Sequence, residues 1–141
     1  MRHLTYTIFV LSGLLLSVAA SAETKPIPKA FHGTWVGHVD KKLTAKQVAS
    51  VCRRSHGEWG TWLITINSKT IDFSYPAGGG GRATVSSYSK YLASNIQGVL
   101  KVKKDVEGDT YTEEEKAGFA VTGNKLKYTY GDFVTNLTKC Q

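Results

Sequence analysis

Apolar and polar residues alternate along most of this chain, in short runs separated by glycine, asparagine, aspartate and proline. Alternation with a period of two places successive side chains on opposite faces, which is typical of strands with one buried face. The residues between the runs are those that tight turns prefer. We therefore predict strands over residues 31–39, 59–66, 71–75, 83–92, 98–103, 111–121, 125–130 and 133–140.

One segment departs from this alternation and predicts a helix. Thr44 is a good N-cap, and Gln47 follows three residues later, which completes a capping box. Val48 and Cys52 are then four residues apart, a spacing that places them on one helical face. The pattern indicates one short amphipathic helix over residues 45–55, with Cys52 on its buried side.

About eight short strands joined by hairpins favour either a closed up-and-down barrel or a two-sheet sandwich. Closure removes the exposed strand edges that a sheet rich in valine, isoleucine and tyrosine would otherwise present. We therefore expect an all-β fold, an eight-stranded antiparallel up-and-down barrel with one short helix after the first strand.

The first 22 residues carry the features of an export signal. Arg2 supplies a positive start, residues 8–18 supply an apolar run, and Ala20, Ser21 and Ala22 form a small-residue cleavage site. We predict cleavage after Ala22, which leaves residues 23–141 as a single barrel domain. The expected location is periplasmic or secreted, without a stable membrane anchor.

The chain contains two cysteines, Cys52 and Cys140. An even number of cysteines in an exported chain is most simply explained by a disulfide, because the compartments outside the cytosol are oxidising. We therefore expect a bond between Cys52 and Cys140, which also removes the free thiolate that cysteine catalysis would need.

The chain is basic, with 18 Lys and Arg against 11 Asp and Glu and a formal net charge of +7. Such a charge favours solubility, and it also attracts anionic surfaces such as lipid headgroups or acidic glycans. Nucleic acid is not an expected partner, because export separates the protein from it. The lysines of the predicted strands also alternate as on a solvated face and do not cluster with exposed aromatic residues.

The segment Phe31 to Trp35 resembles the Gly-x-Trp signature that opens the first strand of lipocalin-like (calycin) barrels. The wider layout is similar to that of small, mostly uncharacterised secreted bacterial proteins. The shared features are this motif, a cysteine-bearing segment at Cys52, the hairpin from Ile64 to Phe73, and a last strand ending in Cys140. The resemblance implies a lipocalin-like barrel that binds a small apolar or amphipathic ligand.

Several aromatic residues have the parity expected of the inward face of such a barrel. They would either line a pocket for an apolar or sugar ligand or simply fill the interior, and the sequence leaves both possibilities open. These ligand-lining candidates are Trp35, Trp62, Phe73, Tyr75, Tyr88, Tyr128 and Tyr130.

Four consecutive glycines, Gly78 to Gly81, precede Arg82 and predict a flexible loop over residues 76–83. The loop resembles the basic, glycine-rich loop with which periplasmic lysozyme inhibitors enter an active site. The alternative function is therefore that of a periplasmic inhibitor or immunity-type protein, which binds an envelope-targeting enzyme through Arg82.

Neither catalysis nor metal binding is expected. His32 and His38 lie six residues apart, about 20 Å along a strand, and we interpret these two and His56 as surface residues. The run from Glu113 to Glu115 is interpreted as an edge, a bulge or a loop. No Gly-x-Ser-x-Gly nucleophile elbow occurs. The expected protein is an exported, non-enzymatic barrel without a cofactor, which binds a small ligand or acts at the cell envelope.

Overall fold

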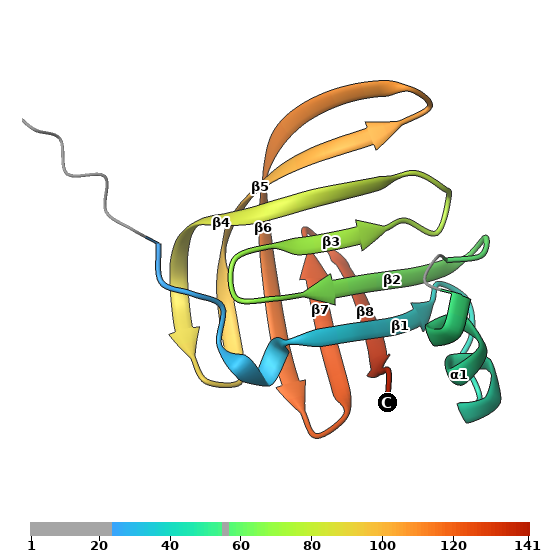
Figure 1. Ribbon diagram of the computed structural model, residues 1–141. Coiled ribbons are helices and arrows are strands. Elements are labelled where there is room, and N and C mark those ends of the chain that lie inside the picture. The colour runs from blue at the N-terminus through green and yellow to red at the C-terminus, as the bar shows by residue number, and fades with distance from the viewer. Residues whose placement is uncertain (1–23, 55–56) are drawn as a thin grey trace, which may run out of the picture.

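The computed structural model describes residues 24–54 and 57–141, and the chain forms a closed barrel of eight antiparallel strands in sequence order (Figure 1). The fold class predicted from the sequence is confirmed. The predicted signal peptide, residues 1–22, and His56 lie outside the described residues. No helix in the described part of the chain has the length and apolar character needed to cross a membrane.

A short 3-10 helix, η1 (Lys29–Phe31), leads into the first strand. The remaining elements are β1 (Gly33–His38), α1 (Ala45–Arg54), β2 (Thr61–Ile66), β3 (Ile71–Ser74), β4 (Gly80–Leu92), β5 (Asn95–Val106), β6 (Asp109–Thr122), β7 (Lys125–Tyr130) and β8 (Phe133–Lys139). Each strand pairs with the next one along the chain, and β8 pairs with β1 to close the barrel.

The glycine-rich loop is shorter than predicted, because β4 begins at Gly80 and includes Arg82. Gly81 pairs with Phe73 of β3. A Cβ atom added at Gly81 would lie 2.7 Å from the hydroxyl oxygen of Tyr75. Gly81 therefore makes room for the Tyr75 side chain, whereas Gly78 and Gly79 form the turn, both with positive φ.

One end of the barrel is closed by aromatic residues near η1. Phe31 and Trp35 are fully buried, and the indole Nε1 of Trp35 donates a hydrogen bond of 2.8 Å to the carbonyl oxygen of Phe31. The Lys139 ammonium lies 5.2 Å from the centre of the Trp35 ring, a cation–π distance. This end of the barrel is therefore sealed by side chains.

Helix α1 packs against the outer face of the barrel. Val48 and Val51 contact Val36 of β1 and Leu63 of β2 in a small cluster outside the main core. The predicted capping box is present, because the amide of Thr44 donates to Gln47 Oε1 at 2.9 Å and the amide of Gln47 donates to Thr44 Oγ1 at 3.3 Å. The helix therefore begins where the sequence predicts it.

The predicted disulfide lies beside the seam that closes the barrel. Cys52 of α1 is bonded to Cys140, and their Cα atoms are 5.7 Å apart. Next to this bond the amide of Cys140 donates a hydrogen bond of 2.8 Å to the carbonyl oxygen of Thr34. The bond therefore joins the helix to the end of the last strand.

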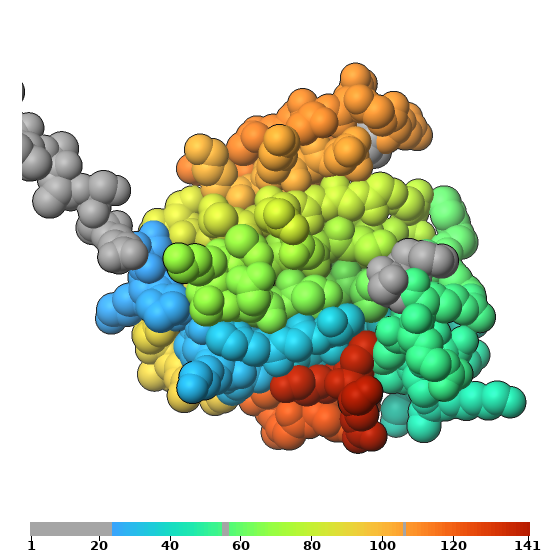
Figure 2. All heavy atoms as spheres, viewed as in Figure 1, coloured from blue at the N-terminus to red at the C-terminus, as the bar shows by residue number. Residues whose placement is uncertain are grey.

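The hairpin formed by β5 and β6 extends beyond the rest of the barrel. Strand β6 pairs with β5 from Asp109 to Ala120, but with β7 only from Ala117 to Thr122. Residues 109–116 thus pair with β5 alone among the described strands. The hairpin projects from the body of the molecule, in orange at the top of Figures 1 and 2.

We predict that the disulfide supplies a large part of the stability of the fold. The two cysteines are 88 residues apart, and replacing both with alanine should lower the free energy of unfolding by about 4 kcal/mol. Thermal unfolding should show a melting temperature roughly 10–20 °C lower. A reductant should lower the melting temperature of the native protein to a similar value and leave that of the double variant unchanged. Equal melting temperatures of the two proteins would contradict the prediction.

Candidate functional site

The barrel interior is a filled core. Of the ligand-lining candidates, Trp35, Trp62, Phe73 and Tyr128 are buried in the main hydrophobic cluster, and Tyr75 and Tyr88 pack against it half-buried. The cavity between Tyr88 and Phe119 has a volume of about 10 Å³, room for roughly one water molecule. Of the two possibilities that the sequence leaves open, the structure favours side chains that fill the interior.

The aromatic rings of this core contact one another directly. The centre of the Trp62 ring lies 5.7 Å from that of Tyr75 and 5.8 Å from that of Tyr128, and both pairs meet edge to face. Phe119 stacks on Tyr128 at 5.0 Å. Burial raises the pKa of the Tyr128 hydroxyl above its usual range. Such contacts are typical of a packed aromatic core.

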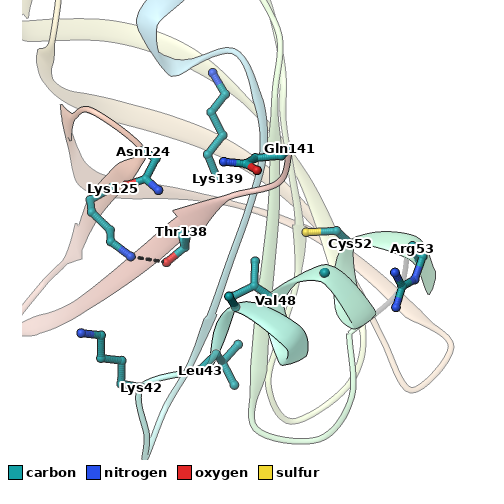
Figure 3. Close-up of a pocket in the computed structure, with 12 residues that line it drawn as sticks. Lys42, Leu43, Val48, Cys52, Arg53, Asn124, Lys125, Thr138, Lys139 and Gln141 are labelled. Carbon is teal, nitrogen blue, oxygen red and sulfur yellow. Dashed lines mark hydrogen bonds between the residues drawn. The ribbon is translucent and has the colours of Figure 1, made fainter.

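A groove lies outside the barrel, between α1 and β8, with a volume of about 500 Å³ (Figure 3). This volume lies within the range of small-molecule sites. Helix α1 and the segment before it supply one wall, and β8 with the β7–β8 side of the barrel supplies the other. The lining residues are Lys42, Leu43, Ala45, Val48, Ala49, Cys52, Arg53, Asn124, Lys125, Thr138, Lys139 and Gln141.

The groove exists because α1 is held beside the seam by the disulfide while small residues face β8. Ala45 and Ala49 line the helical wall and leave space that larger side chains would occupy. Leu43 and Val48 give this wall an apolar character, and Figure 3 shows both side chains on the side of the groove opposite Thr138. A hydrocarbon segment would therefore contact apolar side chains along the helix.

The opposite wall and the entrance are cationic. Lys125 extends along β8 and donates a hydrogen bond of 2.7 Å to Thr138 Oγ1, and Lys42 reaches toward the same space from the segment before α1 (Figure 3). Arg53 of α1 also lines the groove, and its side chain lies on the opposite side of the helix from Lys125 and Thr138 (Figure 3). None of the described residues lining it has an acidic side chain. The arrangement combines an apolar wall with a wall that carries lysine side chains.

The groove continues into a second hollow of about 470 Å³. The two share Lys42, Leu43, Lys125 and Thr138, and the second extends past Val39 and Val134 at the other end of β8. Together they form an elongated surface depression across β8. An extended ligand with an anionic head between Lys42 and Lys125 has room on either side of these lysines.

A second notable cluster lies inside the projecting hairpin. The ammonium of Lys104 on β5 forms ion pairs with Glu113 and Glu115 on β6. It also lies 5.8 Å from the ring of Tyr75 and 5.9 Å from the ring of Tyr130. The glutamate run is thus part of β6, on the half of the strand that pairs with β5 alone, which agrees with the predicted edge.

The three ionised groups have different environments. Burial opposes the charge on Lys104, but its hydrogen bonds to Glu113 and Glu115 outweigh burial and raise its pKa. The hydrogen bond from Lys104 holds the pKa of Glu113 below its usual range. Burial raises the pKa of Glu115. Two carboxylates share one ammonium, so the cluster carries an excess of one negative charge when all three are ionised.

The remaining predicted site residues do not come together. Arg82 lies within β4, its side chain is 69% exposed, and its Nε donates to Asp72 Oδ1 of β3 at 2.6 Å. Arg82 therefore belongs to strand β4 and not to the loop predicted over residues 76–83. His32 Nε2 lies 2.8 Å from the carbonyl oxygen of Ile27, and His38 Nδ1 accepts from the amide of Asp40 at 3.1 Å.

Compared with known proteins, the chain matches no family model, no curated protein and no solved structure. The closed eight-stranded barrel is compatible with the lipocalin-like resemblance of the sequence. Within residues 24–54 and 57–141 no group of three or more histidine, cysteine, aspartate or glutamate side chains is arranged to hold a metal ion. The function is therefore inferred from the geometry of this chain.

Sequence reasoning missed both the groove and the Lys104 cluster. The groove forms because α1 lies next to β8 in the folded chain. These two segments are far apart in the sequence, and no local sequence pattern indicates that they become neighbours. The cluster did leave a signal, since Lys104 shares the parity of the apolar residues Leu100 and Val102, and Glu115 that of Phe119. Charged residues at inward-facing positions of two predicted neighbouring strands indicate a buried ion pair.

We predict that Lys104→Met lowers the free energy of unfolding by about 3 kcal/mol at pH 7, because it leaves the buried Glu115 carboxylate without its partner. Protonation relieves this cost. A buried carboxyl has a raised pKa in the folded state, so the folded variant gains stability relative to the native protein as the pH falls toward 4. Denaturant unfolding at several pH values measures the difference. Lys103→Met, at an exposed neighbouring position, should have little effect, and a loss that is independent of pH would contradict the assignment.

Proposed function

We propose that this protein is an exported, non-enzymatic binding protein that holds a small amphipathic anion in the groove between α1 and β8. The ligand would be a molecule with one hydrocarbon chain and a carboxylate or phosphate head. The observation that carries the proposal is the combination, in one depression of about 500 Å³, of apolar residues on the helix and lysines opposite them.

The apolar part of the ligand would lie along α1. Leu43, Val48 and Ala49 offer it a hydrocarbon surface, and burial of each methylene is favourable by about 0.8 kcal/mol. A chain of several carbons would therefore contribute enough free energy to offset the loss of its motional freedom. The filled barrel interior supports the choice of the groove over the interior for this role.

The head group would lie between Lys42 and Lys125. Both are on the surface, so each contributes a modest attraction that salt weakens, and together they favour an anion over a neutral or cationic head. The excess of basic over acidic residues would raise the local concentration of anionic amphiphiles. Such molecules occur where an export signal would send the protein, next to the membranes of the cell envelope.

The alternative of an enzyme inhibitor acting through residues 76–83 has less support. Arg82 forms an ion pair with Asp72 on the neighbouring strand and lies in a regular part of the sheet, which leaves only a short turn to enter a partner. The groove, by contrast, offers a defined volume, an apolar helical wall and the lysines Lys42 and Lys125.

Isothermal titration calorimetry of the native protein with dodecanoate tests the proposal. We expect saturable binding of dodecanoate and no comparable binding of dodecyltrimethylammonium, which has the same chain and the opposite charge. Ala49→Trp should abolish binding because the indole would occupy the groove from an exposed helical position. Lys46→Trp, on an exposed position of the same helix that does not line the groove, is the matched control.

The variant Lys125→Glu reverses the charge beside the head group. It should weaken dodecanoate binding about five- to tenfold and make this binding less sensitive to salt. Lys101→Glu on the outer face of β5 reverses a charge outside the groove and should leave the affinity nearly unchanged. If both amphiphiles bind equally well, or if Ala49→Trp binds like the native protein, the groove is not the site.

A further inference from the structure

The acidic residues of this basic protein are concentrated in one hairpin. Six of the 11 Asp and Glu residues lie between residues 105 and 115, at the projecting end of β5 and β6. They are Asp105, Glu107, Asp109, Glu113, Glu114 and Glu115. The projecting hairpin, in orange in Figure 2, therefore has a charge opposite to that of the groove beside α1.

The same hairpin has a strand edge without a neighbour. From Asp109 to Lys116, β6 pairs with β5 on one side, and no other described strand pairs with it on the other. Strand β7 reaches only to Tyr130, which pairs with Ala117, and the chain then turns away into β8. Backbone amides and carbonyls along residues 109–116 are thus available for a further strand.

The ionisable side chains next to this edge carry one more negative charge than positive charge. Glu113 and Glu115 share the single ammonium of Lys104, which approaches from β5. Glu115 is only 7% exposed, whereas Glu113 is 38% exposed and can be reached from the open side of β6. A second cation next to Glu113 would balance the cluster.

Aromatic side chains also lie exposed around the opening. Tyr111 and Tyr130 share the inward face of their strands with the cluster, and each remains partly accessible to solvent. Their rings offer a surface on which the hydrocarbon stems of lysine or arginine side chains pack. The opening therefore combines hydrogen-bonding backbone, an unbalanced carboxylate and aromatic faces.

We propose that residues 109–116 of β6 bind an extended cationic peptide segment, which adds to the barrel as a strand next to the edge of the hairpin. Main-chain hydrogen bonds to β6 would supply affinity. Alternate side chains of the added strand would face the cluster, so specificity would come from lysine or arginine at every second position, one of them opposite Glu113. The surface would thus serve a protein partner, separately from the amphiphile groove.

The charges at this edge also protect it from other pairings. Native proteins place charged residues on open strands to prevent association with apolar strands and with other copies of themselves. Two such acidic edges repel each other, whereas a cationic strand is attracted to the same residues. Protection from self-association and selectivity for a basic partner therefore follow from the same residues.

The test uses two short, end-capped peptides added to the native protein. The first alternates lysine with threonine, and the second has the same sequence but carries methyl groups on the backbone nitrogens of its four central residues, which removes strand hydrogen bonds whichever edge of the peptide faces β6. We expect the first peptide to bind and to slow hydrogen exchange of amides within residues 109–116, as measured by NMR. The second should bind at least fivefold more weakly and protect none of these amides.

Two matched variants separate strand addition from general attraction to acidic residues. Glu113→Gln should weaken binding of the lysine–threonine peptide about fivefold, whereas Glu114→Gln, with the same loss of charge on the opposite face of β6, should leave it nearly unchanged. Equal affinity for the two peptides, equal effects of the two variants, or protection located outside residues 109–116 would each overturn the proposal.

Discussion

The seam between β1 and β8 is the constraint on which the rest of this molecule depends. These strands share only two residue pairs, Trp35 with Lys139 and Val36 with Thr138, whereas β5 and β6 share twelve. So few hydrogen bonds would leave the barrel open to fraying at its closing edge. The disulfide between Cys52 and Cys140 lies directly beyond these pairs and restricts that opening, because it joins the last strand to the helix packed on β1.

The same bond defines the candidate ligand site. Helix α1 packs against β1 and β2 through Val48 and Val51, and these contacts alone do not fix its distance from β8. The disulfide sets that distance, and both Cys52 and the residues next to Cys140 line the groove. A barrel this small fills its interior with aromatic side chains to obtain a stable core. Its outer surface, where a helix stands apart from a strand, then offers room for a ligand.

Much of the fold was readable from the sequence because its determinants are local. Alternation identified the strands, the Thr44–Gln47 capping box placed the start of α1, and the cysteine count gave the disulfide. The start of β4 was missed because glycine normally weakens a strand, and only the inward Tyr75 explains Gly81. The groove and the open edge of β6 depend on which elements become neighbours in space, and local patterns do not record that.

The most direct measurement is the set of intermolecular nuclear Overhauser effects between carbon-13-labelled dodecanoate and the native, disulfide-bonded protein. We expect contacts from the hydrocarbon chain to the methyl groups of Leu43, Val48 and Ala49, and from the carbons nearest the head to Thr138. Contacts to Phe73, Phe119 or Tyr128 would instead place the ligand inside the barrel, and would contradict both the filled core and the external site.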